Sequence, residues 1–110
     1  MKELLKELAE SKLVRITGSY ADGTQKETSD IDFYVKPNNP ESDFSERNML
    51  KIIAILKKYK VGWESNMVGY IHTHNVDYSL PIPMEFSDLF KPRRGKLKNV
   101  SIMGIEFKTF

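Results

Sequence analysis

The sequence contains no cysteine. This absence excludes disulfide bonds and any metal site built on thiolate ligands. No apolar run is long enough to cross a bilayer and no segment resembles a secretory signal, so we expect a cytoplasmic protein without a membrane partner. Histidine is scarce as well. His72 and His74 form an H-x-H pair, but nothing else in the sequence completes a zinc site, and a loop or surface position is the favoured interpretation.

The rest of the composition is that of an ordinary folded protein, with 40% hydrophobic and 29% charged residues. A length of 110 residues favours one domain over residues 1–110. The net charge is only +2, yet the segment KPRRGKLK at residues 91–98 carries five basic side chains and no acid. This basic segment fits contact with a polyanion, such as RNA or a triphosphate, and equally a solvated hairpin loop.

Hydrophobic periodicity predicts a mixed α/β (α+β) chain. Apolar residues at helical spacing predict two helices, one over residues 2–12 and one whose buried stripe is Met49, Leu50, Ile52, Ile53 and Leu56. Ser42 and Asp43 are expected to cap the second helix. Strands are predicted over residues 13–17, 31–35, 63–73, 82–86 and 100–107, with a bulge at Gly69 and a loop at 74–79. This order of elements predicts one mixed sheet with the helices on one face.

The most informative segment is GSYADGTQKETSDIDFYV at residues 18–35. Side chains two apart on a strand point to the same face, so Asp30 and Asp32 should project together. Two adjacent carboxylates repel each other unless a cation neutralises them, and paired oxygen ligands suit Mg²⁺ bound to substrate phosphates. Gly18 and Ser19 supply a close backbone approach and a hydroxyl for a phosphate group. The alternative is a strand edge with two solvated acids after an ordinary turn.

A P-loop is excluded, although Gly18 and Gly23 have its glycine spacing. That motif requires a lysine directly after the second glycine, and Thr24 stands there instead. The G-x-S-x-G motif of serine hydrolases does not occur either.

The segment resembles the nucleotidyltransferases that share a fold with DNA polymerase beta, and above all their small stand-alone members, the minimal nucleotidyltransferases. Their pattern is Gly-Ser-x-Ala-x-Gly followed by Ser-Asp-Ile-Asp, and the matching residues are Gly18, Ser19, Ala21, Gly23, Ser29, Asp30, Ile31 and Asp32. The close match covers residues 16–35. One departure is Asp22, where many members carry arginine; an acid at this position would repel phosphate or RNA.

The resemblance implies a nucleotidyltransferase fold, a mixed sheet of about five strands with helices packed mainly on one face. It implies a metal-dependent enzyme that transfers a nucleoside monophosphate from a triphosphate such as ATP to a hydroxyl of a protein or RNA acceptor, with release of pyrophosphate. Asp30 and Asp32 would hold Mg²⁺, as one ion or two. Gly18, Ser19 and Ser29 would bind the nucleotide.

The family also uses a third carboxylate from a later strand, which often activates the acceptor hydroxyl. Glu85 is the preferred candidate as catalytic residue and metal ligand, since the apolar residues on either side of it direct it to the polar face of a strand. Glu64 is the rival, because the shortest family members place their acid in the first strand after the long helix. Asp88 is the third choice. For each of the three, a solvent-facing strand acid is the alternative.

The resemblance does not identify the molecule that accepts the nucleotide. Many small members act with a separate helical protein, as in toxin–antitoxin pairs, and antibiotic-modifying members carry an additional helical domain for which 110 residues leave no room. We therefore expect a protein or RNA acceptor, with a helical toxin-like partner or a homodimer to complete the acceptor site. Two alternatives stay open: an inactive nucleotidyltransferase-fold module that acts as an antitoxin or nucleotide sensor, and an RNA-binding module that uses the basic segment.

Overall fold

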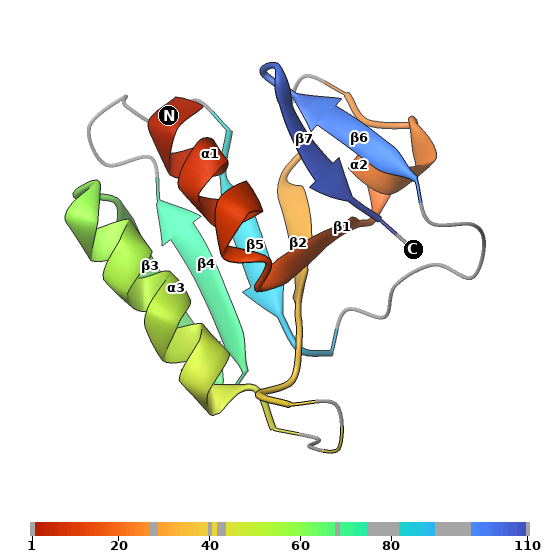
Figure 1. The fold of residues 1–110 in the computed structure, drawn as a ribbon. Helices are drawn as coiled ribbons and strands as arrows, with labels where there is room; N and C mark the ends of the chain where they lie inside the picture. Colours follow the sequence, from red (N-terminus) through yellow and green to blue (C-terminus); the bar gives the residue numbers. More distant parts are fainter. Residues whose placement is uncertain are drawn as a thin grey trace.

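A computed structural model describes most of the chain: residues 2–26, 29–39, 41, 44–67, 69–74, 82–89 and 98–109. Within these residues the chain forms three helices and seven strands (Figure 1). In chain order they are α1 (Lys2–Ser11), β1 (Val14–Thr17), α2 (Ser19–Asp22), β2 (Ile31–Val35), α3 (Glu46–Lys58), β3 (Gly62–Met67), β4 (Tyr70–His74), β5 (Met84–Ser87), β6 (Asn99–Ile102) and β7 (Ile105–Lys108).

Five of these strands form one mixed sheet in the order β1-β2-β5-β4-β3. β2 and β5 run parallel, whereas every other neighbouring pair in this sheet is antiparallel. A parallel pair requires a long connection, and α3, β3 and β4 lie between β2 and β5 in the chain. In Figure 1, α1 and α3 cover the same face of the sheet, and β7 contacts α1 and β1. The predicted mixed sheet with helices mainly on one face is therefore confirmed.

Alternation along β2 separates an apolar face of the sheet from a polar one. Ile31, Phe33 and Val35 are fully buried, whereas Asp32 and Tyr34 between them are only partly buried. The buried side chains belong to one cluster with the apolar stripes of the long helices and with β7, which contribute Leu4, Leu5, Leu8, Ile52, Leu56 and Phe107. Full burial of side chains of this size stabilises the fold by about 1.5–3 kcal/mol each. The core therefore lies under the helices, and the opposite face is left to polar side chains.

Two of the predicted strands are in fact β-hairpins. The strand predicted over residues 63–73 divides into the antiparallel pair β3 and β4. Gly69 lies in the turn between them with a φ of 81°, a conformation that glycine adopts without steric cost, while the irregular pairing falls earlier, between Glu64 and Met67. The strand predicted over residues 100–107 divides into β6 and β7 in the same way, and these two strands form a separate two-stranded sheet instead of joining the five-stranded one. Both predictions were wrong because a tight turn interrupts each predicted strand, at Gly69 and at Gly104, where glycine has φ values of 81° and 80°.

The apolar stripe predicted for α3 is not buried throughout. Leu50 is 66% exposed and Ile53 is partly buried, whereas Met49, Ile52 and Leu56 are buried. Asn48 is buried as well, because its side-chain amide donates hydrogen bonds of 2.9 and 3.1 Å to two backbone carbonyls of the loop after β2. A buried amide with both protons satisfied costs little, so the helix tolerates it on its inner face.

Several predictions fall on residues that the structure does not describe. They are the caps at Ser42 and Asp43, most of the loop at 74–79, and the basic segment up to residue 97. The helix α3 begins after Ser45, whose side chain makes no capping hydrogen bond. Within the described part of the chain, no helix is long and apolar enough to cross a membrane.

Candidate active site

The polar face of the sheet brings together residues that are far apart in the sequence. Asp32 on β2 pairs with Glu85 on β5, and Glu85 pairs in turn with His72 on β4. Because paired residues on neighbouring strands project to the same side of a sheet, these three side chains form one row. The row continues at its two ends with Thr17 and Glu64. Strand register thus assembles a row of polar side chains that no single segment contains.

Position along this row separates the two glutamates considered as the third carboxylate. Glu85 stands on the strand next to Asp32. Glu64 stands two strands beyond Glu85, roughly 10 Å away at the usual strand spacing, and it is exposed. The structure therefore places Glu85, and not Glu64, beside the aspartates of the motif.

Asp30 reaches the same cluster from the segment directly before β2. Ligand atoms of Asp30, His72 and Glu85 lie within 4.8 Å of one another, and all three residues are partly buried. Nε2 of His72 is 3.9 Å from Oε1 of Glu85. The sequence favours a loop or surface position for His72, whereas the structure places it within β4, between two other strands. We refer to Asp30, Asp32, His72 and Glu85 as the acidic cluster.

Asp32 carries the clearest electrostatic signature of the acidic cluster. Burial raises its pKa, and so do the charge of Glu85, a hydrogen bond with Glu85 and the charge of Asp30, which together shift the pKa from 3.8 to about 6. A hydrogen bond between two carboxyl groups requires a proton on one of them. The cluster therefore favours any positive charge that can replace this proton, such as a divalent cation.

Two tyrosines border the acids. Burial raises the pKa of Tyr70 to about 12, with a hydrogen bond to Glu85 and the nearby negative charges adding to the shift. Burial and the charge of Asp30 likewise raise the pKa of Tyr20 on α2. Both phenols therefore stay protonated at neutral pH, and that of Tyr70 donates its hydrogen bond to Glu85. The sequence places neither Tyr70 nor His72 beside Glu85, because only the pairing of β4 with β5 brings them there.

A strained glycine closes the site at the end of β1. Gly18 has a φ of 71° and a ψ of −150°, a region of backbone conformation that is essentially restricted to glycine. A Cβ at this position would collide with the carboxylate of Asp32. The carbonyl of Gly18 accepts hydrogen bonds of 3.1 and 3.2 Å from the N–H groups of Ala21 and Asp22, which form the single turn of α2. Glycine is therefore required here by conformation and by contact.

The two serines predicted to bind nucleotide occupy different surroundings. Ser19 opens α2 directly after the strained glycine, and its carbonyl accepts a 3.0 Å hydrogen bond from the N–H of Thr24. Oγ of Ser29 accepts a 2.8 Å hydrogen bond from the backbone N–H of Lys26, and the N–H of Ser29 donates to the Lys26 carbonyl. Ser29 thus closes the loop that delivers Asp30 to the cluster.

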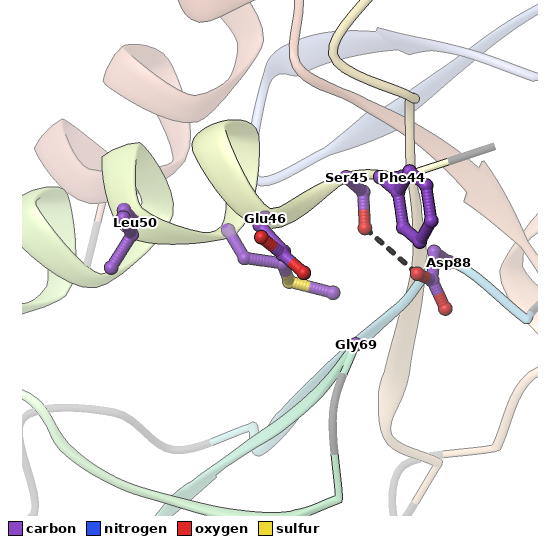
Figure 2. Close-up of a pocket in the computed structure, with 7 residues that line it drawn as sticks. Phe44, Ser45, Glu46, Leu50, Gly69 and Asp88 are labelled. Atoms are coloured by element: carbon purple, nitrogen blue, oxygen red, sulfur yellow. Dashed lines mark hydrogen bonds between the residues drawn. The ribbon is translucent and has the colours of Figure 1, made fainter. Parts of the chain in front are cut away.

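Asp88 lies away from the acidic cluster. It follows β5 and accepts a 2.8 Å hydrogen bond from the hydroxyl of Ser45, at the start of α3 (Figure 2). A Cβ on Gly69 would stand 2.5 Å from Oδ1 of Asp88. Around this contact is a hollow of about 330 Å³ lined by Phe44, Ser45, Glu46, Met49, Leu50, Gly69 and Asp88. Asp88 therefore belongs to the packing between α3 and the β3–β4 turn.

Comparison with known proteins gives a match over almost the whole chain. A family model described as a nucleotidyltransferase domain matches residues 1–102, which run from α1 through β6 and include the complete acidic cluster and the turn at Gly18. No curated protein and no solved structure gave a significant match.

Proposed function

The chain belongs to the nucleotidyltransferase domain family, and we propose that it transfers a nucleoside monophosphate from a nucleoside triphosphate to a hydroxyl group of a protein or RNA, with release of pyrophosphate. The observation that carries this proposal is the convergence of Asp30, Asp32 and Glu85 beside the strained turn at Gly18. Transfer at phosphorus needs mainly positioning and charge neutralisation from a protein, and this arrangement suits both.

The donor set fits Mg²⁺, bound as one ion or two. Asp30, Asp32 and Glu85 offer hard oxygen ligands, which are the ligands that Mg²⁺ takes from proteins. The raised pKa of Asp32 reflects burial first and then the negative charges of Glu85 and Asp30, and a bound cation would offset both. Bound to these carboxylates, the metal would neutralise the triphosphate and the charge that develops on the departing pyrophosphate.

Glu85 is the proposed proton acceptor of the reaction. The oxygen of the acceptor hydroxyl forms a bond to the α-phosphorus, and its proton passes to a carboxylate oxygen of Glu85. The bond from the α-phosphorus to the bridging oxygen breaks, and pyrophosphate leaves with its electron pair. Tyr70 supports this role because it donates a hydrogen bond to Glu85 and so holds the carboxylate in place.

The turn after β1 is the proposed binding site of the triphosphate. The glycine at position 18 keeps the backbone close to Asp32, where no side chain fits. Backbone N–H groups at Gly18 and Ser19 and the hydroxyl of Ser19 are the proposed donors to phosphate oxygens. Ser29 contributes indirectly, since its hydrogen bonds with Lys26 fix the loop that leads into Asp30.

The test uses each nucleoside triphosphate labelled at the α-phosphate, with Mg²⁺ and with total RNA or cell lysate as the source of acceptor. We expect label from one triphosphate on one macromolecular band. The double variant Asp30→Asn/Asp32→Asn should give no label, whereas Asp88→Asn, which removes a carboxylate outside the cluster, should label normally. Treatment of the labelled band with ribonuclease or protease then identifies the class of acceptor.

The same experiment separates the alternatives. Label retained by the double variant would overturn the assignment of the site. Nucleotide binding that depends on Mg²⁺, without transfer to any acceptor, would favour an inactive module that acts as an antitoxin or sensor. RNA binding that ignores Mg²⁺ and weakens with salt would favour a role for the basic segment alone.

A further inference from the structure

The imidazole of His72 belongs to the acidic cluster but has no role in the proposed transfer reaction. Its Nε2 is 3.9 Å from Oε1 of Glu85, and ligand atoms of Asp30, His72 and Glu85 lie within 4.8 Å of one another. Two atoms bound to one ion at about 2.1 Å each are at most about 4.2 Å apart. Small side-chain rotations therefore bring all three residues to ligand distance of a single ion.

The backbone holds these ligands on fixed elements. His72 lies within β4, which is flanked by β3 and β5, and Glu85 is its direct partner on β5. Asp30 precedes β2, where the N–H of Ile31 donates a 3.0 Å hydrogen bond to the carbonyl of Pro83 and ties this segment to the start of β5. Ligands carried on neighbouring strands of one sheet keep their mutual positions, so the set is largely preformed.

The chemistry of the set differs from that of carboxylates alone. Mg²⁺ is bound in proteins by oxygen ligands and water. An imidazole nitrogen suits transition metals, whereas carboxylate oxygens suit both Mg²⁺ and Mn²⁺. Zn²⁺ prefers four ligands in a tetrahedral arrangement, which the many oxygens of two or three carboxylates and a triphosphate do not match. Of the two ions that carboxylates suit, a site rich in oxygen with one nitrogen therefore favours Mn²⁺ over Mg²⁺.

We propose that His72 is a ligand of the metal site and that it makes the site prefer Mn²⁺ to Mg²⁺. The inference rests on the proposed function, because it concerns the metal that this function requires. It extends that function by naming a nitrogen ligand and a metal preference.

The test measures metal binding to the full chain without nucleotide. Calorimetric titration with each ion should give an affinity for Mn²⁺ at least about tenfold higher than for Mg²⁺. Pulsed electron paramagnetic resonance of bound Mn²⁺ should show coupling to a ¹⁴N nucleus. His72→Gln should abolish this coupling and weaken Mn²⁺ binding by about tenfold or more, while Mg²⁺ binding changes by less than about twofold.

Two further variants control the interpretation. His74→Gln removes the only other histidine of the chain and should keep the ¹⁴N coupling. His72→Asp replaces the nitrogen by an oxygen ligand, so it should bind both ions, without the preference for Mn²⁺ and without the coupling. The spectrum of the wild-type protein needs no variant, so poor folding of His72→Gln would not remove the test.

Mn²⁺ bound without ¹⁴N coupling would overturn the inference, and so would coupling that survives in His72→Gln. Either result would leave the proposed transferase standing, because Mg²⁺ binding and labelling would be unchanged. Failure of the wild-type protein to bind either ion, with or without nucleotide, would count against both the inference and the proposed function.

Discussion

Asp32 and Asp88 each lie against a glycine, but the other groups around the two carboxylates differ. Asp32 lies against Gly18 and Asp88 lies against Gly69, and in each case a Cβ on the glycine would meet the carboxylate. The φ values of the two glycines are 71° and 81°, so both contacts depend on a conformation that other residues adopt only at a cost. Close contact with a glycine is therefore not what makes an aspartate part of the acidic cluster.

The neighbours of the two carboxylates make the difference. Asp88 accepts a hydrogen bond from Ser45, so the protein itself supplies a donor to it (Figure 2). Asp32 is partly buried and meets two further acids, Glu85 and Asp30, and burial together with these charges raises its pKa to about 6. A carboxylate that receives donors from the protein is satisfied in the folded state and serves packing. A carboxylate that faces other acids needs a proton or a bound cation to neutralise it. This is the situation of the carboxylates in a metal site.

The largest effect should come from removing the charge of Glu85, the acid that faces Asp32. Glu85→Gln keeps the shape of the side chain and removes its charge, so we expect the rate of nucleotide transfer to fall by about 100-fold or more, as for a lost general base. Glu64→Gln removes the same charge two strands away and should change the rate by less than about threefold, because solvent screens an exposed charge. Initial rates of label incorporation measure both variants. Equal losses would contradict the choice of Glu85.

Alanine at the two glycines tests whether the backbone contacts have different consequences. Gly18→Ala and Gly69→Ala should each lower the free energy of unfolding by roughly 1–3 kcal/mol, through the unfavourable φ and the displaced carboxylate. Only Gly18→Ala should also weaken Mg²⁺ binding, because it displaces Asp32. Urea denaturation measures the first effect and calorimetric titration the second. Equal weakening by Gly69→Ala would mean that general destabilisation, and not the contact with Asp32, controls metal binding.

The part of the site that lies within one segment was predictable from the sequence. Gly18, Ser19, Asp30 and Asp32 follow one another closely, and the spacing of two residues predicts that the two aspartates project together, although Asp30 lies just before β2 and not within it. The match of the nucleotidyltransferase domain to residues 1–102 confirms the resemblance and the fold class drawn from these residues. Local spacing carries this information because it does not depend on which strands pair.

The rest of the site depends on strand pairing, which local patterns do not encode. Glu85 and Glu64 both fit the polar face of a strand, and only the register of β2 with β5 places one of them beside Asp32. His72 and Tyr70 enter the site through the pairing of β4 with β5. An alternating pattern gives the face of each side chain but not its neighbours, so the sequence does not place these two residues beside Glu85, and it singles out His72 only as half of an H-x-H pair.

The smallest expected effect is a dependence of stability on pH that Asp32 carries. Without a bound cation, the pKa of Asp32 is about 6 in the folded protein against an ordinary 3.8, so between these values the folded state holds a proton that the unfolded state has released. Through this group, the fold gains stability as the pH falls through 6, and the gain is complete below 3.8. Because Asp32 is only partly buried, screening by solvent limits the gain to on the order of 1 kcal/mol.

Asp32→Asn should remove this contribution, whereas Asp88→Asn should leave it intact. Urea unfolding in the presence of a chelator, at about pH 7 and about pH 5, gives the change in stability for each variant, and its difference from wild type isolates one group from the other carboxyls that titrate in this range. Saturating Mg²⁺ should suppress the effect, because a bound cation favours the ionised carboxylate. If the free energy of unfolding changed equally with pH in Asp32→Asn and in the wild type, the acids around Asp32 would not set it apart from Asp88. The distinction between a cation site and a packing contact would then fail.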